Sequence, residues 1–186
     1  MTSHIFPAIR LTLLSLVLFS GLYTLAVWGA AQLLPHRGMA ERVGYNGQNG
    51  YANVGQTFSD DRYFWSRPSA VAYNAAGSGG SNKGPGNPDY LAAVQARVDT
   101  FLAHHPGVRR EQIPADMVTA SGSGLDPHLS PEAAYLQVAR VAQVRGLDAA
   151  KVAELVHAHT QQAWLGIFGQ PRVNVLLLNI DLDQLK

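Results

Sequence analysis

The chain has 186 residues, room for one ordinary domain, and 47% of them are apolar. Its 14 Lys and Arg against 13 Asp and Glu give a formal charge of +1. No basic stretch interleaved with aromatic residues is present, which excludes the usual signature of a nucleic-acid-binding protein. The sequence contains no cysteine, so the redox state of its compartment cannot be inferred from cysteine usage.

An uncharged run of 24 residues, Leu11–Leu34, dominates the N-terminal part. As a helix it would reach about 36 Å, and the hydrocarbon core of a bilayer is roughly 30 Å thick. Tyr23 and Trp28 are amphipathic aromatics typical of such spans. A cleavable signal peptide is the alternative, because Arg10 precedes the run and Gly29-Ala30-Ala31 resembles a cleavage site. The run is about twice as long as a signal-peptide core of roughly 7 to 15 residues, so we predict an uncleaved anchor.

The orientation of this span is not fixed by charge bias, because Arg10 flanks one end while Arg37 and Arg42 flank the other. Residues 35–186 carry as many basic as acidic side chains and no polybasic stretch that would resist export. We therefore expect a short cytoplasmic N-terminus over residues 1–10, a transmembrane helix over residues 11–34 and an extracytoplasmic domain over residues 35–186.

The domain is expected to start with a small hairpin and a long loop. Residues 36–58 predict short strands, with Asn46-Gly47 and Asn49-Gly50 as favourable type I′ turns. An aromatic-rich segment, residues 62–73, follows. Residues 74–88 contain five glycines and two prolines, which excludes regular structure there.

Three helices come next, each predicted from a capping residue at its N-terminus. Asn87-Pro88-Asp89 begins the first, Ser130-Pro131-Glu132 the second and Asp148 the third. Pro106-Gly107 ends the first helix, Gly146 ends the second, and the third is expected to end by about Thr160. Their predicted apolar faces are Leu91, Val94, Val98, Phe101 and Leu102; Leu136, Val138, Val141 and Val144; and Val152, Leu155 and Val156.

The chain closes with Val173–Ile180, a run rich in strand formers and too continuously apolar to be half exposed. It predicts an interior strand. Strands at both ends of the domain with helices between them favour a compact α+β domain of about 130 to 150 residues behind one transmembrane helix.

Two stretches resemble ion-binding or phosphate-binding motifs but lack the required context. Val43-Gly44-Tyr45 matches the centre of a potassium selectivity filter, yet a filter needs four such strands and a preceding pore helix, so we predict a turn region. Gly77–Lys83 lacks the spacing of a phosphate-binding loop and the strand and helix that bracket one. We interpret it as a surface or interface loop.

The stretch Ser121–Pro131 contains the residue types of a hydrolase, with Ser121 or Ser123 as nucleophile, His128 as base and Asp126 as its orienting carboxylate. Asp126 and His128 are expected to be too near in sequence to orient each other, and no nucleophile elbow is present. We interpret the stretch as a tight turn that leads into a capped helix.

Seven histidines raise the question of a metal site. His104 and His105 end a predicted helix, while His157 and His159 project to different sides of another, so neither pair has ligand spacing. We expect solvated surface histidines and no metal ligands.

Several motifs in a fixed order resemble the C chain of the bacterial potassium-transporting ATPase, the Kdp system. They lie behind one N-terminal span and cover nearly the whole chain: Gly55-Gln56-x-Phe58, Tyr63-Phe64-x-x-Arg67-Pro68-Ser69-Ala70, Ser78-Gly79-Gly80-Ser81-Asn82, Asn87-Pro88, Val118-Thr119-Ala120-Ser121-x-Ser123-Gly124-Leu125-Asp126, Leu129-Ser130, Arg140-Val141-Ala142 and Gly169-Gln170-Pro171-Arg172-Val173-Asn174-Val175. No single block is diagnostic, but the ordered set is specific. The chain departs from the family pattern at Lys83, Gly122 and His128, which cautions against giving Lys83 or His128 a role.

This resemblance implies a non-catalytic accessory subunit of a bacterial inner-membrane complex. Its partners would be a channel-like potassium-binding subunit, a P-type ATPase subunit, a small single-pass subunit and membrane lipid. The phosphorylation motif Asp-Lys-Thr-Gly-Thr is missing from the sequence, so ATP and K⁺ would be handled by the partners, and no catalytic, cofactor-binding or metal-binding residue is expected.

The family is described as a catalytic chaperone that raises the ATP affinity of the ATPase subunit. An exported domain cannot touch cytoplasmic ATP, so such an effect would pass through the span as a coupling free energy of about 1 to 3 kcal/mol. We expect the partner-contact residues to be Gly79, Gly80, Asn82, Ser121, Ser123, Gly124 and Asp126. The alternative is a free-standing membrane-anchored envelope enzyme or binding protein with Asp126 and His128 in its site.

Overall fold

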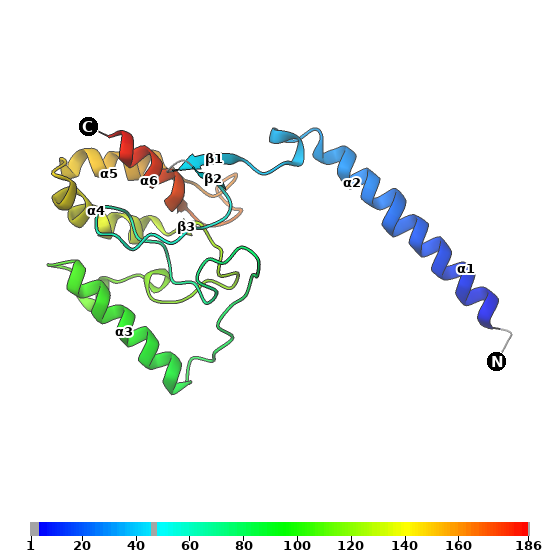
Figure 1. Cartoon of the computed structure of the whole chain (residues 1–186), viewed down its shortest axis with the longest axis horizontal. Helices are drawn as coiled ribbons and strands as arrows, with labels where there is room; N and C mark the ends of the chain where they lie inside the picture. The colour runs from blue at the N-terminus through cyan, green and yellow to red at the C-terminus, as the bar shows by residue number, and fades with distance from the viewer. Residues whose placement is uncertain (1–3, 46–47, 186) are drawn as a thin grey trace. The chain divides into compact units, whose positions relative to one another are not determined.

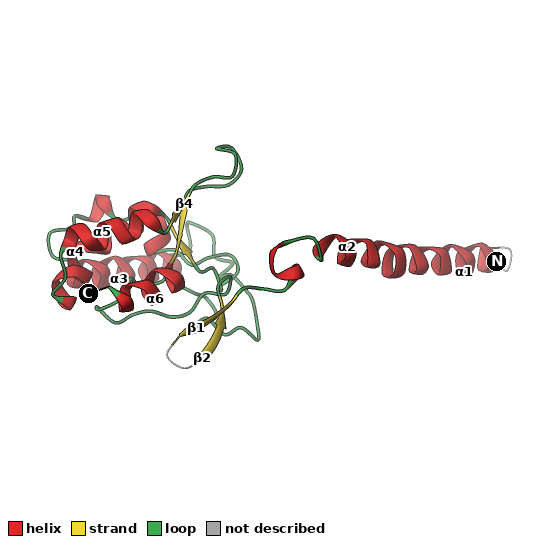
Figure 2. Ribbon diagram, turned by 90° about the horizontal axis from the view of Figure 1, so that it is seen from above, coloured by secondary structure: helices red, strands yellow, loops and turns green. Residues whose placement is uncertain are grey.

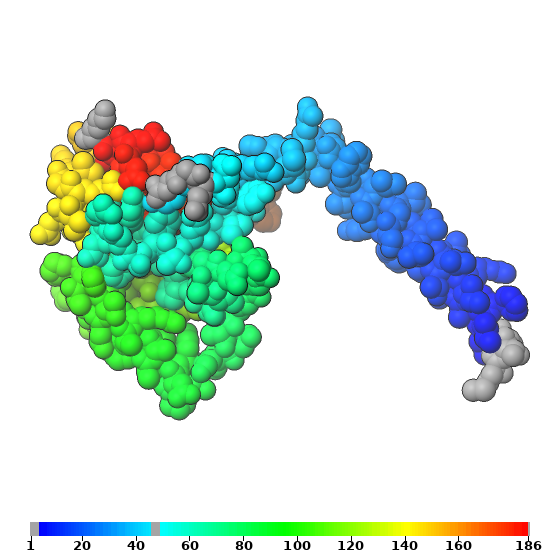
Figure 3. Space-filling model, viewed as in Figure 1, coloured from blue at the N-terminus to red at the C-terminus, as the bar shows by residue number. Residues whose placement is uncertain are grey.

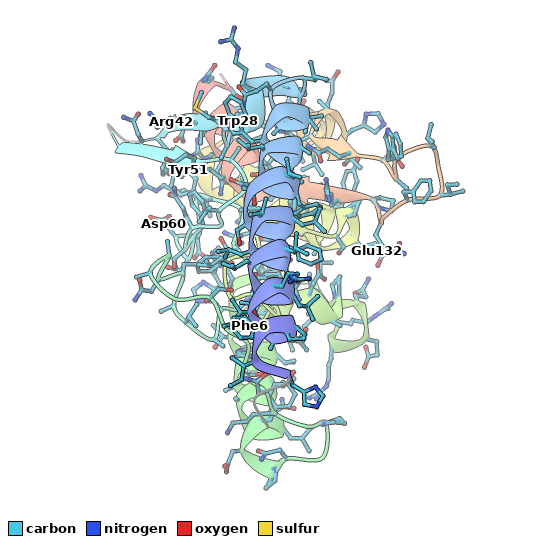
Figure 4. The ribbon with its side chains drawn as sticks, turned by 90° about the vertical axis from the view of Figure 1, so that its right-hand side faces the viewer. Phe6, Trp28, Arg42, Tyr51, Asp60 and Glu132 are labelled. Atoms are coloured by element: carbon cyan, nitrogen blue, oxygen red, sulfur yellow. The ribbon has the colours of Figure 1, made fainter. Side chains whose placement is uncertain are left out.

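The computed structural model describes residues 4–45 and 48–185 and divides into two units at residues 41 and 42. The first unit is one long helix, made of α1 (Ile5–Ser15), a π-helical stretch η2 (Leu16–Tyr23) and α2 (Thr24–Ala31), with Phe6 and Trp28 near its two ends (Figure 4). Within the described residues it is the one helix long and apolar enough to cross a membrane, by its length and composition. It begins before the predicted Leu11 and ends before Leu34. Pro35 opens a separate 3₁₀ turn, Pro35–Gly38.

The predicted hairpin is present at the start of the second unit. Strands β1 (Arg42–Tyr45) and β2 (Gln48–Tyr51) are antiparallel, with Val43 opposite Gly50. Arg42 and Tyr51 face each other across it, the guanidinium 5.9 Å from the ring centre (Figure 4). Asn46-Gly47 lies outside the described residues, and Asn49-Gly50 belongs to β2 and is not a turn.

The three helices predicted from their caps are all present (Figure 1): α3 (Pro88–His104), α4 (Pro131–Arg145) and α5 (Ala149–Ala158). The side chains of Asn87, Ser130 and Asp148 each accept a hydrogen bond from a first-turn amide, at 3.0, 3.1 and 2.8 Å. Gly146 ends α4 with a left-handed φ of 66°. Two 3₁₀ turns, Arg110–Gln112 and Ala115–Met117, lie between α3 and α4.

The predicted C-terminal strand is wrong beyond Asn174. Strand β5 (Arg172–Asn174) is the centre of a three-stranded antiparallel sheet with β3 (His128–Leu129) and β4 (Thr160–Gln161), and the chain then turns into helix α6 (Val175–Gln184). Asn174 stabilises the start of the new helix, because its side-chain oxygen accepts a hydrogen bond from the amide of Leu177 at 3.1 Å. A continuous apolar run fits a helix that is buried on several sides as well as it fits an interior strand.

The core of the second unit lies among α3, α4, α5 and α6, which are grouped together in Figure 2, and it also includes Phe58 and Phe64. Phe64 is fully buried yet belongs to no strand or helix. Its backbone is held by an amide side chain of α6: Asn179 Oδ1 accepts from Phe64 N at 2.9 Å, and Asn179 Nδ2 donates to Phe64 O at 3.0 Å. Gln137 of α4 accepts from Trp65 N at 2.7 Å. Two helix-borne amides thus replace the ladder that a strand would have supplied.

Candidate functional site

The two loops that hold the predicted partner-contact residues lie side by side. Gly79 N donates to Ser123 O at 2.9 Å, and Ser78 Oγ donates to the same oxygen at 3.0 Å. A Cβ atom on Gly80 would lie 3.1 Å from the carbonyl oxygen of Gly122. The structure therefore joins residues 78–80 and 121–124 into one surface, which we call the loop junction. Asn82 lies just beyond these contacts, exposed, with a left-handed φ of 50°.

Gly124 determines how closely the loops approach. Its φ is 69°, and a Cβ there would lie 2.5 Å from Val71 Cγ2 and 2.8 Å from Gly79 O. The first property strains any L-residue, and the second leaves no room for a side chain. Ser69 Oγ adds a hydrogen bond to Gly124 O at 2.7 Å. Only glycine satisfies both constraints at this position.

Both candidate nucleophiles have structural hydrogen bonds. Ser121 Oγ is buried and accepts from Gly124 N at 2.9 Å, while Ser123 Oγ accepts from Leu125 N at 3.1 Å. These are the side-chain-to-backbone bonds of tight turns. The interpretation of the stretch as a turn leading into a capped helix agrees with this geometry.

Asp126 links the loop junction to Arg67. Its carboxylate accepts from Arg67 Nη1 at 2.9 Å and lies 3.2 Å from His128 Nδ1, so the expectation that Asp126 and His128 are too near in sequence to orient each other easily is wrong. Burial opposes ionisation of Asp126, but the hydrogen bonds from His128 and the charge of Arg67 outweigh it and lower the pKa of the carboxyl group. The carboxylate is therefore a fixed anion that holds the arginine in place.

A cavity of about 440 Å³ adjoins this pair, between residues 57–73 and helix α3 (Figure 3). Phe58, Trp65, Phe101 and Met117 form much of its wall, Arg67 and Arg97 add positive charge, and none of the described residues lining it is acidic. Arg67 Nε is buried and has no hydrogen-bond partner among the described residues. Burial raises the pKa of Tyr73, another lining residue, whose hydroxyl donates to Arg67 O at 2.7 Å.

The sequence alone does not predict this cavity. Its walls come from segments far apart in the chain, so the residues that line it show no common pattern in the sequence.

His105 is buried, which corrects the expectation of solvated histidines. It is 2% exposed and stacks on the ring of Phe101 at 3.7 Å between centroids. His105 Nε2 accepts from Arg140 Nε at 2.9 Å, and Nδ1 lies 2.8 Å from the carbonyl oxygen of Phe101. This arrangement requires a neutral ring with its proton on Nδ1. Burial, together with the charge of the neighbouring Arg140 guanidinium, lowers the pKa of His105 to about 4.

Arg140 is the hub of this buried network. Its guanidinium donates to the carbonyl oxygens of Asp61 and Tyr63 and lies 4.8 Å from the centre of the Trp65 ring. Burial lowers the pKa of Arg140 to about 10, so the group stays charged at neutral pH. Within residues 4–45 and 48–185, no group of three His, Cys, Asp or Glu side chains has the geometry to hold a metal ion.

The sequence profile of the family described as "KdpC: K+-transporting ATPase, c chain" matches residues 5–184. The chain belongs to this family. The chain is 54% identical to the "Potassium-transporting ATPase KdpC subunit" of Bacteroides fragilis over 183 residues, an alignment that covers 96% of each protein. It is 53% identical to the protein of the same name from Flavobacterium johnsoniae, over 98% of this chain and 99% of the relative. It is 49% identical to the protein of that name from Polaromonas naphthalenivorans, over 97% of this chain and 94% of the relative.

The match includes both the apolar helix and the domain up to residue 184. Members of the K+-transporting ATPase c chain family are accessory, non-catalytic subunits of the Kdp ATPase. The turn geometry of Ser121 and Ser123 is consistent with this, because both hydroxyl groups have structural partners.

Proposed function

We propose that this chain is the single-pass accessory subunit of a potassium-transporting ATPase of the bacterial inner membrane. The apolar helix, expected over residues 11–34 and formed by Ile5–Ala31, crosses the membrane, the residues before it are cytoplasmic, and the domain expected over residues 35–186 is extracytoplasmic. Its partners are the channel-like potassium-binding subunit, the P-type ATPase subunit and the small single-pass subunit. The observation that carries the proposal is the family match over residues 5–184, which spans anchor and domain together.

The loop junction is the surface that we propose for partner contact. Within it Ser123 is exposed and Gly79 and Gly80 are partly exposed, and the exposed Asn82 lies just beyond it, so these four residues offer main-chain and short polar groups to a partner. Ser121 and Gly124 are buried, and Asp126 is engaged by Arg67 and His128. These three residues shape the surface from beneath, which differs from the direct contact expected from the sequence.

The proposed effect on ATP affinity is indirect. ATP is cytoplasmic and we propose that the domain lies outside, so the chain affects the ATPase subunit through its span and through the partner subunits. A coupling free energy of about 1 to 3 kcal/mol is of the size that such linkage provides.

Orientation and assembly can each be tested in the complete complex. Because the chain has no native cysteine, Asn82→Cys can be labelled with a membrane-impermeant maleimide in intact cells. Labelling before permeabilisation is expected, and labelling only after it would place the domain in the cytoplasm. Assembly is measured by co-purification in detergent with the two large polytopic subunits. A chain that purifies alone under conditions that preserve those subunits would refute membership in the complex.

A further inference from the structure

The cavity between residues 57–73 and helix α3 has an apolar floor and an open mouth. Phe58, Phe101 and Met117 are buried and form the floor, and the ring of Trp65 meets that of Phe101 edge-on at 6.2 Å between centroids. The exposed residues that line the mouth are Thr57, Ser59, Ala72, Ala96 and Thr100. The volume of about 440 Å³ lies within the roughly 300 to 1,000 Å³ that small-molecule sites occupy. The cavity is therefore large enough for a small organic molecule.

Arg97 brings an unbalanced positive charge to the wall of the cavity. The residue is partly buried, and its Nη1 donates to the carbonyl oxygen of Val118 at 2.9 Å. In the part of the chain that the structure describes, no ion pair involves Arg97. Arg67 is the other cation of the wall, and Asp126 balances its charge at 2.9 Å. Since none of the described lining residues is acidic, the cavity favours a ligand that carries negative charge.

The guanidinium of Arg67 keeps hydrogen-bonding capacity beyond its pair with Asp126. Asp126 accepts from Nη1, while Nε is buried with no hydrogen-bond partner among the described residues. The nearby hydroxyl groups are already used, because Ser69 Oγ donates to Gly124 O at 2.7 Å and the Tyr73 hydroxyl donates to Arg67 O at 2.7 Å. A buried donor without a partner costs free energy. An acceptor that entered the cavity and met this guanidinium, after a small rotation of the side chain, would remove that cost.

These features together select one class of ligand. A neutral apolar molecule would leave Arg97 without a counter-ion, and inorganic phosphate would leave the apolar floor without a contact. A nucleoside triphosphate carries several negative charges, whereas the wall offers only the charge of Arg97 that is not already balanced, so most of the phosphate charge would lie unpaired. A molecule with an apolar body and a single negative charge meets both the floor and the wall.

We propose that the cavity binds a small organic anion with one negative charge and an aromatic or similarly apolar body. The body packs on Phe58, Phe101 and Met117, and the anionic group pairs with Arg97 and accepts a further hydrogen bond from Arg67. This inference does not depend on the proposed function, because every residue of the site belongs to the domain itself and no partner subunit contributes to it.

Methionine methyl groups report binding at this site without interference from detergent. The full chain contains three methionines; Met117 lines the cavity, and Met39 is 69% exposed and does not line it. The chain, labelled with methyl-¹³C methionine in non-ionic detergent micelles, is titrated with 2-naphthoate, whose rings shift the resonance of a nearby methyl group. Met117→Leu assigns the signal.

We expect the Met117 signal to move and saturate, with a Kd on the order of 1 mM or tighter for a ligand of this size, while Met39 shows no saturable change. The neutral isostere 2-naphthamide should bind at least tenfold more weakly, because it cannot pair with Arg97. A Met117 signal that does not move, or equal affinities for the acid and the amide, would overturn the proposal. A saturable shift of Met117 with ATP would refute the assignment to singly charged anions.

Two pairs of variants locate the binding. Ala96→Trp fills the mouth and should abolish the shift, whereas Ala92→Trp, at an exposed position of α3 that does not line the cavity, should bind as the wild type. Arg97→Gln keeps a donor for Val118 O but loses the charge, so it should weaken binding at least tenfold, while Arg110→Gln removes an exposed arginine away from the cavity and should have no effect. Equal affinities within either pair refute the site. The alanine pair alters only exposed positions, so it decides the question even where Arg97→Gln disturbs the fold.

Discussion

Acid should weaken the domain through one side chain, His105. In the folded state its ring accepts a hydrogen bond from Arg140, and a protonated ring would instead place a second cation and an N–H against that donor. The pKa of His105 is accordingly lowered from 6.5 to about 4. The unfolded chain therefore binds a proton between these two pH values that the folded chain does not bind.

The sign and size of the effect follow from this difference. The stability that the neutral ring contributes is complete above pH 6.5 and is lost as the pH falls to about 4. At 1.36 kcal/mol for each pH unit, the free energy of unfolding should drop by about 3 kcal/mol over that interval.

The assay is urea unfolding of the full chain in detergent micelles at pH values from 7 to about 4, followed by near-ultraviolet circular dichroism. His105→Gln keeps an acceptor for Arg140 but does not titrate, so its unfolding free energy should lack this dependence on pH. His157→Gln removes an exposed histidine and should behave as the wild type. An unfolding free energy of the wild type that stays flat over this interval, or a slope that persists in His105→Gln, would refute the reasoning.

Three further substitutions test individual contacts by the same unfolding measurement. Gly124→Ala and Gly146→Ala both place alanine at a left-handed φ, which costs about 1 kcal/mol, but only the Cβ at position 124 meets neighbouring atoms. Gly124→Ala should therefore lose about 1 to 3 kcal/mol more than its control, and equal losses would contradict the close approach. Asn174→Ala removes the cap of α6 and the hydrogen bond to Ala52 O, so we expect a loss of about 2 to 3 kcal/mol; a neutral result would contradict the account of the switch from β5 to α6. Ser130→Ala should cost about 1 kcal/mol through the cap of α4, and no change would mean that Ser130 is dispensable there.

Local signals predicted the parts of the fold that local chemistry determines. Asn87, Ser130 and Asp148 predict the starts of α3, α4 and α5, because a capping side chain bonds to amides two or three residues away. The β1–β2 hairpin was predicted from turn residues. The order of these elements was enough to predict a mixed α+β domain behind an apolar helix.

Features that depend on tertiary contacts could not be predicted. The run from Val175 to Ile180 is apolar except for Asn179, a pattern that fits a buried helix as well as a strand, and the cap by Asn174 together with tertiary packing decides that it is a helix. The buried His105 bonds to Arg140, 35 residues further along the chain, so the residues next to His105 in the sequence do not indicate that it is buried. The sequence suggested candidate contact residues on two loops, but the joining of these loops into the loop junction, and which of its residues face solvent, required the structure.

The pairing of Phe64 with Asn179 has a consequence for how the protein is made. The two residues are 115 positions apart, and Asn179 lies in the last helix of the chain. The ribosome synthesises the aromatic segment long before α6, so the amide and carbonyl of Phe64 have no Asn179 side chain to bond to until synthesis is nearly complete. The domain therefore closes only after translation has reached α6, and a stop codon placed just before that helix would leave an open core rather than a trimmed end.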